Sequence, residues 1–253
     1  MTTQTLLLTD KYRDQIRRCA QAMALAYGED VRPFLAPGMR VEQVKLFTDG
    51  NLEKRRDKLL DQVELIKAVF SNLDELVAEF MHEVPLAAYD TGCSDGDQFL
   101  RWLSLLDDAT VEQQDYLQCQ LARHEIERIA RRNRLGHVRF QEMWSMVDSL
   151  SGELKTNSQL RVHLNPIRTW SRFQTAALLE EDTPTPAEVL FFACENQIRT
   201  SVFEEVGLRC VENLASHGPL TLQNWKCLDR SISRSELIAF CLDASEMGLV
   251  AFG

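Results

Sequence analysis

Apolar residues in the first 150 positions recur at helical spacing. After Glu53, four of them follow one another at intervals of four, three and four residues, which places them on one helical face: Leu59, Val63, Ile66 and Phe70. The pattern continues past Ser71, which would cap a second helix. An earlier helix is predicted over 10–27, with Gly28 as its end.

Two stretches beside these helices are rich in proline, glycine and small polar residues. Residues 31–49 include Pro33 and Pro37, and residues 84–97 include Pro85. Because such residues interrupt regular structure, both stretches are predicted to be connections.

A capping box opens the last helix of this half. Thr110 and Gln113 have the spacing at which each side chain satisfies a free backbone amide at a helix start, and Gly136 is the predicted end. Residues 148–159 are polar and separate a region of helical patterns from a region that begins with strand patterns. They predict the boundary between a helical domain, residues 1–155, and a second domain, residues 156–253.

The second domain begins with strand patterns. Leu160–Leu164 alternates apolar and polar residues before a turn at Asn165-Pro166. Residues 189–194 and 198–203 have strand composition and follow a linker over 180–186. Because Thr185–Glu188 also has the pattern of a helix start, one long helix is the alternative, and a β-hairpin is the preferred interpretation.

Three helices are predicted at the end of the chain. They cover 204–217, 222–229 and a segment from the capping box at Ser233 to Met247, and Gly248 precedes an extended tail. Three strands followed by three helices is the order of a winged-helix-like module with a small antiparallel sheet. The predicted fold class is therefore α+β, with an N-terminal helical domain before this module.

Composition and charge indicate the class of protein and its compartment, but they say little about its function. Of 253 residues, 45% are hydrophobic and 26% are charged, as in globular proteins. The longest apolar runs have six residues and the first ten residues lack a secretory signal, so we expect a cytoplasmic protein without membrane contact. The formal charge of −10 disfavours nucleic-acid binding across the whole surface.

Cysteine and histidine spacing gives no metal or catalytic motif. The seven cysteines stand at least 14 residues apart, so we expect reduced, mostly buried thiols. Arg128 occupies the position where an HExxH motif starting at His124 needs its second histidine. Glycine-rich nucleotide loops and a nucleophile elbow are absent from the sequence. We therefore assign no catalytic residue, metal or cofactor to this chain.

Arginines gather on one half of the helix after Thr110, at Arg123, Arg128, Arg131, Arg132 and Arg134. Residues 121–140 hold six arginines and two glutamates, a local charge of +4 that leaves −14 elsewhere. A solvated face paired with carboxylates is one interpretation. The other is a docking surface for an acidic partner, because arginine binds carboxylates through two parallel bonds.

The predicted hairpin offers a binding mode of its own. If Ile198–Phe203 is a sheet edge, its free amides and carbonyls can pair with an extended peptide. In the alternative, a neighbouring element covers that edge.

The order and spacing of several segments resemble the partner subunits of multinuclear non-haem iron-dependent oxidases, which modify ribosomally made peptides. The segments are 53–80, Gly96–Leu103, Asp115–Glu125, Leu160–Pro166, the hairpin, 208–218 and Gly248–Phe252. Within that family the 3-thiaglutamate pathway is nearest, which implies help in excising a carbon from a peptide's C-terminal cysteine.

The resemblance implies a non-catalytic subunit of a heterodimer. An iron-containing barrel oxygenase would supply the metal, and a C-terminal module similar to peptide-recognition elements would hold the precursor peptide. That peptide would add as a strand beside Ile198–Phe203 and contact the last helix. The peptide-binding residues expected from this arrangement are Arg199, Ser201, Phe203, Leu237, Phe240 and Cys241, with Arg199 pairing an acidic residue of the precursor.

Two other classes of function stay open at this stage. A winged-helix DNA-binding regulator would place Arg230 and Arg234 against phosphates, although residues 219–253 contain only one more basic residue, Lys226. A stand-alone helical metal or haem enzyme would take its ligands from His82, His124 and nearby acids.

Overall fold

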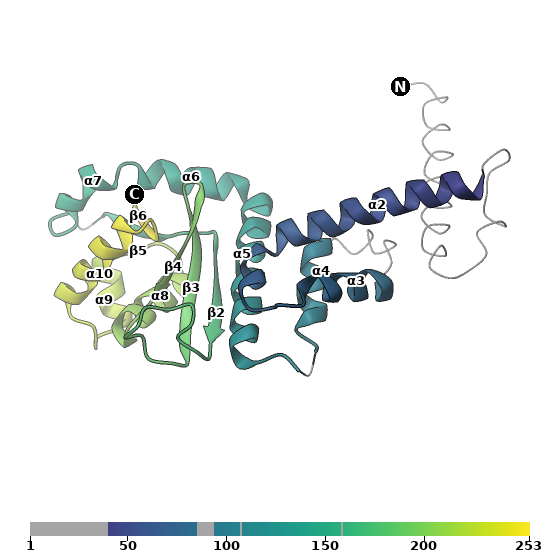
Figure 1. Cartoon of the computed structure of the whole chain (residues 1–253). Coiled ribbons are helices and arrows are strands. Elements are labelled where there is room, and N and C mark those ends of the chain that lie inside the picture. The colour runs from purple at the N-terminus through teal and green to yellow at the C-terminus, as the bar shows by residue number, and fades with distance from the viewer. Residues whose placement is uncertain (1–39, 85–93, 107, 158) are drawn as a thin grey trace, which may run out of the picture. The chain divides into compact units, whose positions relative to one another are not determined.

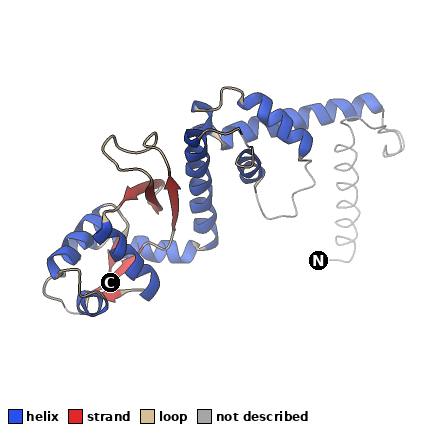
Figure 2. Cartoon of the chain, turned by 90° about the horizontal axis from the view of Figure 1, so that it is seen from below, coloured by secondary structure: helices blue, strands red, loops and turns tan. Residues whose placement is uncertain are grey.

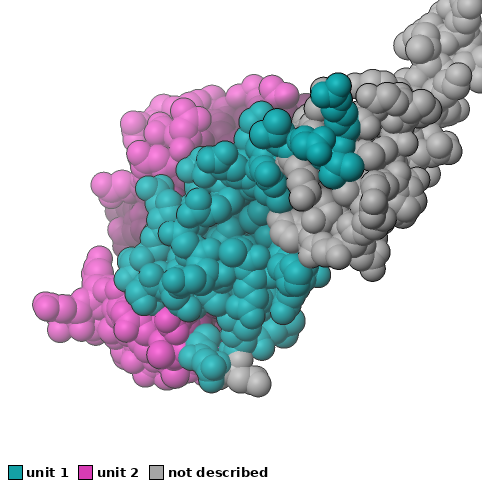
Figure 3. Space-filling view, turned by 45° about the vertical axis from the view of Figure 1, so that its right-hand side comes forward, with its two compact units in different colours: residues 1–109 teal, residues 110–253 magenta. Residues whose placement is uncertain are grey.

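A computed structural model of the chain describes residues 40–84, 94–106, 108–157 and 159–253 (Figure 1). These residues combine helices with two small antiparallel sheets, so the α+β class is confirmed. The chain divides into two compact units, residues 1–109 and 110–253, which Figure 3 colours separately. Among the described residues, no helix is long and apolar enough to cross a membrane.

Helices make up the described part of the first unit. It contains α2 (Val41–Gln62), the 3₁₀ turn η2 (Glu64–Ala68), α3 (Leu73–Glu83) and α4 (Asp95–Leu103). The predicted connection over 31–49 is wrong from Val41 onward, because the prolines that suggested it stand before α2. The helix predicted over 10–27 lies outside the described residues.

The apolar face predicted for this unit is confirmed, although one continuous helix does not carry it. Leu59, Val63, Ile66 and Phe70 are all buried, and the helix breaks at Val63 between α2 and η2. The next helix, α3, is capped at Asn72 instead of Ser71.

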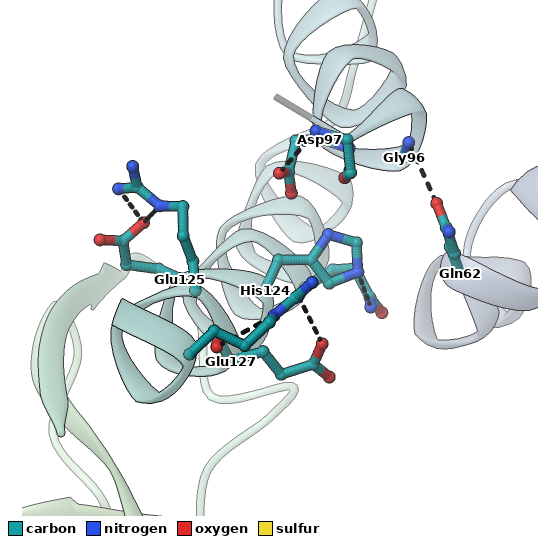
Figure 4. A network of polar contacts seen from close by, with 10 residues as sticks. Gln62, Gly96, Asp97, His124, Glu125 and Glu127 are labelled. Carbon is teal, nitrogen blue, oxygen red and sulfur yellow. Dashed lines mark hydrogen bonds and ion pairs between the residues drawn. The ribbon is translucent and has the colours of Figure 1, made fainter. Parts of the chain in front are cut away.

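A glycine and a partly buried ion pair hold α4 against its neighbours. Residues 95–97 belong to α4 and not to the predicted connection, because Ser94 and Asp97 form a capping box. The amide of Gly96 donates to Gln62 Oε1 at 3.1 Å, and a Cβ at Gly96 would lie 2.4 Å from that oxygen (Figure 4). Arg55 Nε and Nη2 each donate to Asp95 at 2.7 Å.

The second unit begins with a series of helices. They are α5 (Val111–Arg132), α6 (Arg134–Trp144), α7 (Val147–Leu150) and the 3₁₀ turn η4 (Ser151–Glu153). The capping box of Thr110 and Gln113 is present, as predicted. Gly136 does not end α5. The break falls at Asn133, and Gly136 lies inside α6, where a Cβ would be 2.4 Å from Asn133 Oδ1.

Two three-stranded sheets follow in the same unit. One has the order β2-β3-β4, formed by Arg168–Phe173, Ala187–Cys194 and Gln197–Val202. The other has the order β5-β1-β6, formed by Leu220–Thr221, Arg161–Leu164 and Val250–Phe252. Every pairing is antiparallel.

The predicted hairpin is confirmed as β3 and β4, which excludes one long helix over these residues. The grouping of three predicted strands is wrong in one respect, because β1 pairs with β5 and β6 in the other sheet. The missing strand β2 escapes sequence reasoning because only Ser171 and Phe173 of its six residues are buried.

The three predicted terminal helices are present as α8 (Glu205–His217), α9 (Leu222–Leu228) and α10 (Arg234–Glu246). Ser233 and Glu236 form the predicted capping box. Gly218 and Gly248 follow α8 and α10 with φ of 75° and 81°, backbone angles that only glycine adopts at little cost.

Strand β3 is buried on both faces. Leu190, Phe192 and Cys194 belong to the core that contains residues of α8, α9, α10 and the β5-β1-β6 sheet. Phe191, on the other face, is also fully buried, and α5 packs against β2 and β3 (Figures 1 and 2). The predicted domain boundary at 155/156 lies within this unit, between η4 and β1.

A buried asparagine joins the two sheets. Asn165 Nδ2 donates to the carbonyls of Ala193 at 2.7 Å and Gly248 at 3.0 Å, and Asn165 Oδ1 accepts from the amide of Ile167 at 2.9 Å. Ala193 belongs to β3 and Gly248 precedes β6, so one side chain fixes both sheets.

Of the described cysteines, four are buried and one is exposed, and all are free thiols: Cys119, Cys194, Cys210, Cys241 and the exposed Cys227. Burial raises the pKa of Cys210 to about 12 and also raises that of Cys241. These two thiols are therefore protonated at neutral pH and serve as packing groups.

Candidate functional site

Strand β4 forms one edge of its sheet. It pairs with β3 alone, and its outer side has no strand beside it among the described residues. An edge strand directs alternate backbone amides and carbonyls away from the sheet. The prediction that Ile198–Phe203 is a sheet edge is therefore confirmed over β4.

The hydrogen-bond register identifies which backbone groups point outward. Ala193 is paired with Ile198, and its amide donates to the carbonyl of Ile167, on the side of β3 opposite β4. In an antiparallel ladder, both members of such a pair turn their amides and carbonyls away from each other. Ile198 therefore points its backbone groups outward, and so do Thr200 and Val202, two and four residues later.

Three outward residues of β4 leave the edge of the sheet open. In the described part of the chain, the backbone amides and carbonyls of Ile198, Thr200 and Val202 form no hydrogen bond with a residue outside β3. Their side chains share the sheet face on which α5 packs, but α5 packs against β2 and β3. Thr200 is exposed and Val202 is 40% exposed.

Two contacts connect the region of β4 with the region of α10. Arg199 Nη1 donates to the carbonyl of Met247 at 3.0 Å, and the rings of Phe203 and Phe240 are 6.3 Å apart. Phe203 directly follows β4, and Met247 directly follows α10.

The predicted peptide-binding residues divide into two groups. Arg199, Ser201 and Phe203 are partly exposed on or directly after β4. Leu237 and Cys241 are fully buried, and Phe240 is 9% exposed between Phe203 and Trp225. The inner face of α10 therefore fills the core, and Leu237 and Cys241 have no surface for a peptide in this conformation.

Arg199 already has a partner. Its guanidinium donates to a carbonyl at the C-terminal end of α10, where helix carbonyls lack intrahelical donors. The expected pairing of Arg199 with an acidic peptide residue would compete with this bond.

The arginine face of α5 is partly neutralised from within the helix. Arg128 binds Glu125 through both Nε, at 2.7 Å, and Nη2, and Arg131 Nη2 lies 3.4 Å from Glu127 (Figure 4). The remaining members of the predicted docking set are Arg123, which is half-buried, and the exposed Arg132 and Arg134. The structure thus keeps the exposed arginines at the α5–α6 junction.

The basic residues of the DNA-binding alternative hold loops together. Lys226 Nζ donates to the carbonyls of Arg230, at 3.0 Å, and Ile232, and Arg234 Nη2 donates to the carbonyl of Lys155 at 2.8 Å. The exposed surface of α10 adds Asp243 and Glu246. A phosphate backbone meets more acidic than basic groups on this helix.

The histidines of the metal-enzyme alternative lie on two helices, His82 on α3 and His124 on α5, where His124 Nε2 lies 3.1 Å from Gln120 Nε2. Across residues 40–84, 94–106, 108–157 and 159–253, no group of three or more histidine, cysteine or acidic side chains is arranged to hold a metal ion.

The register adds a detail that the sequence did not provide, namely which residues of β4 direct their backbone groups outward. Arg199 and Ser201 turn their backbone groups toward β3, whereas Ile198, Thr200 and Val202 face outward. The two-residue turn between Cys194 and Gln197 was the available signal, because such turns close on a hydrogen-bonded pair.

Comparisons of the chain with protein-family models, with curated proteins and with solved structures found no match.

Proposed function

We propose that this chain is a non-catalytic subunit that binds a ribosomally made precursor peptide as an added strand beside β4. It would present that peptide, with its C-terminal cysteine as a candidate reacting residue, to a multinuclear non-haem iron oxygenase in a heterodimer. The observation that carries the peptide-binding part is the free outer edge of β4, with its three outward residues Ile198, Thr200 and Val202.

The order of elements supports this proposal. Strands β2, β3 and β4 are followed by helices α8, α9 and α10, which is the order expected of a winged-helix-like peptide-recognition element. The second sheet departs from that simple pattern, because β5 and β6 are interleaved with the helices and pair with β1. We therefore propose a winged-helix-like module to which a closing sheet has been added.

The edge supplies modest affinity and leaves specificity to side chains. Each main-chain hydrogen bond contributes about 0.5–1.5 kcal/mol net, so a few bonds give weak binding by themselves. Contacts on the two sides of β4 must supply the remainder, which is the general pattern in strand addition. The oxygenase would hold the iron, and the complex would act in the cytoplasm.

A proline substitution tests the edge directly. Thr200→Pro removes one outward amide and leaves the ladder to β3 in place, since prolines are tolerated at sheet edges. Thr200→Ala keeps that amide and is the matched control. The probe is a random 12-residue peptide library displayed on its own mRNA and selected on the full chain.

Peptides enriched on the parent chain should bind Thr200→Ala normally and lose at least tenfold in affinity for Thr200→Pro. Equal binding to both variants, or no enrichment at all, would overturn strand addition at β4. Co-expression with a candidate iron-barrel oxygenase tests the heterodimer, which should purify as a one-to-one complex containing iron. Separate elution of the two proteins would contradict it.

A further inference from the structure

We infer that the N-terminal half of α6 is the docking surface for the oxygenase subunit, and that the surface it meets on that subunit is acidic. This inference rests on the proposed function and names the interface of its heterodimer. It is based on the apolar, basic and unsatisfied polar groups that α6 carries, and on the position of α6 near the start of β4.

Two large apolar side chains on α6 are exposed to solvent. Leu135 is 76% exposed and Val138 is 46% exposed. They are three residues apart, so they are neighbours on one helical face. The other face of α6 joins the core through the buried Phe140, so the fold does not use the exposed pair for packing. An apolar centre of this kind inside a polar rim is the usual arrangement of a protein interface.

Three arginines border this apolar pair. Arg134 directly precedes Leu135, Arg139 follows Leu135 by four residues, and Arg132 is the last residue of α5. All three are exposed, and none of them forms an ion pair or a side-chain hydrogen bond within the residues that the structure describes. They are therefore available to bind carboxylates of another protein, each through two parallel bonds.

The charge of this surface indicates the kind of partner that it fits. Residues 132–142 contain three arginines and one glutamate, in a chain whose formal charge is −10. A second copy docked symmetrically through α6 would oppose arginine with arginine, which is unfavourable. An anionic membrane is a poorer match, because helices that lie in a membrane surface carry a wide apolar face and α6 exposes one adjoining pair. A protein surface with carboxylates around an apolar centre complements both features.

Two buried polar atoms on the same helix lack hydrogen-bond partners. Within the described residues, His137 Nδ1 and Gln141 Nε2 are shielded from solvent and form no hydrogen bond. Native proteins rarely leave such atoms unsatisfied. Gln141 follows His137 by four residues and Val138 by three, so these side chains are neighbours on the helix. Both polar side chains are partly exposed, so a small rotation toward a bound partner would give each atom a hydrogen bond. This observation points to a partner independently of charge.

Helix α6 ends near the start of β4. A Cβ at Gly248 would lie 2.3 Å from Cys194 Sγ and 3.6 Å from Trp144 Cε2, so the last residues of α6 and β3 are close together (Figure 1). Cys194 is paired with Gln197, the first residue of β4. The exposed apolar pair precedes Trp144 by nine and six residues, which is about 9–14 Å along the helix. A partner docked there therefore lies within reach of one end of a peptide bound along β4.

Two double variants test this surface in the complex with a candidate iron-barrel oxygenase. One removes the apolar centre, Leu135→Ala with Val138→Ala, and the other reverses the charge, Arg134→Glu with Arg139→Glu. The dissociation constant of each complex is compared with that of the parent chain. Peptides enriched on the parent chain should bind both variants normally, which shows that the β4 edge is intact.

Two matched controls make the same kinds of change at exposed positions outside α6. Leu105→Ala with Val111→Ala shortens two other exposed apolar side chains, which are 80% and 51% exposed. Lys54→Glu with Lys58→Glu changes the net charge by the same amount on α2.

Each α6 variant should bind the oxygenase about tenfold more weakly or worse, and each control should change binding by less than about twofold. Added salt should weaken the parent complex and affect the arginine variant much less. Unchanged binding by both α6 variants would overturn this inference and leave the heterodimer intact. If the parent chain forms no complex, the heterodimer itself is overturned.

Vesicles of phosphatidylcholine and phosphatidylserine provide the remaining comparison. The parent chain should not bind them. Binding by the parent that both α6 variants lose would assign this surface to a membrane and overturn the inference.

Discussion

The two sheets of the second unit are equal in strand number and opposite in design. The β2-β3-β4 sheet is made from three strands that follow one another in sequence, and β4 remains open on its outer side. The β5-β1-β6 sheet is made from strands of two to four residues drawn from distant parts of the chain. Helices α6, α7 and α10 pack against β6, and every residue of β6 is buried.

The difference between the two sheets shows that strand pairing serves two purposes in this unit. The short sheet brings the last strand back to β1 and closes the core. The longer sheet is anchored by β3, which is buried on both faces, and can therefore leave β4 free without losing its fold.

Substitution of Asn165, which joins the two sheets, should cause the largest loss in the free energy of unfolding. Asn165→Ala leaves the carbonyls of Ala193 and Gly248 and the amide of Ile167 buried without partners. Each lost partner costs about 1–3 kcal/mol, so we expect a loss of about 4 kcal/mol or more in the free energy of unfolding, measured in urea. Asn224→Ala, on the exposed side of α9, should change it by less than about 0.5 kcal/mol. A similar small change at Asn165 would show that the sheets are not joined there.

Gly248 provides the next test of the same joint. Its φ is 81°, and a Cβ there would lie 2.3 Å from Cys194 Sγ. Gly248→Ala should therefore cost about 3 kcal/mol, of which about 1–2 kcal/mol comes from the backbone angle. Adding Cys194→Ala should recover the steric part and leave the backbone part. Full recovery, or none, in thermal unfolding would contradict this division.

A proline at the open edge of β4 should lower the free energy of unfolding far less than a proline in the β5-β1-β6 sheet. Thr200→Pro removes an amide without a partner, so the free energy of unfolding should fall by about 1 kcal/mol or less. Val162→Pro, in the central strand β1 between Leu220 and Phe252, should cost about 3 kcal/mol or more. Equal losses in urea unfolding would show that β4 depends on its outer amides after all.

The smallest predicted effect is a loss of stability in acid, caused by His163 in the β5-β1-β6 sheet. Burial, with a further contribution from Arg161, lowers the pKa of His163 below its ordinary value of 6.5. The folded state therefore disfavours protonation. Stability is complete above pH 6.5 and falls as the pH drops through the unfolded and then the folded pKa. The β2-β3-β4 sheet contains no histidine. His163→Gln should flatten the loss of urea stability between pH 7.5 and 5.5, and an unchanged slope would refute the assignment.

Local signals made much of this fold predictable. The capping boxes at Thr110 and Ser233 and the stop at Gly248 depend on residues within one turn, and all three are present. Strand β2 was missed because its burial comes from α5 and not from an apolar pattern of its own. The strands that pair with β1 could not be predicted either, because the pairing of β1 with β5 and β6 depends on how the terminal helices fold back.

The candidate site was predictable in location and not in detail. The hairpin and its edge follow from composition near Val189 and Ile198. Leu237 and Cys241 were placed at the surface because an amphipathic helix does not reveal which side the core takes. The outward residues required the register of β3, which only the folded sheet provides.

The open edge of β4 bears on how the protein behaves at high concentration. An unprotected strand edge is a template for a second copy of itself, and edge-to-edge pairing is a common start of aggregation. Two β4 strands from separate molecules would bring Glu195, Glu204 and Glu205 of one against those of the other. Like charges in that arrangement repel, so the carboxylates at the two ends of β4 protect the edge from homotypic assembly.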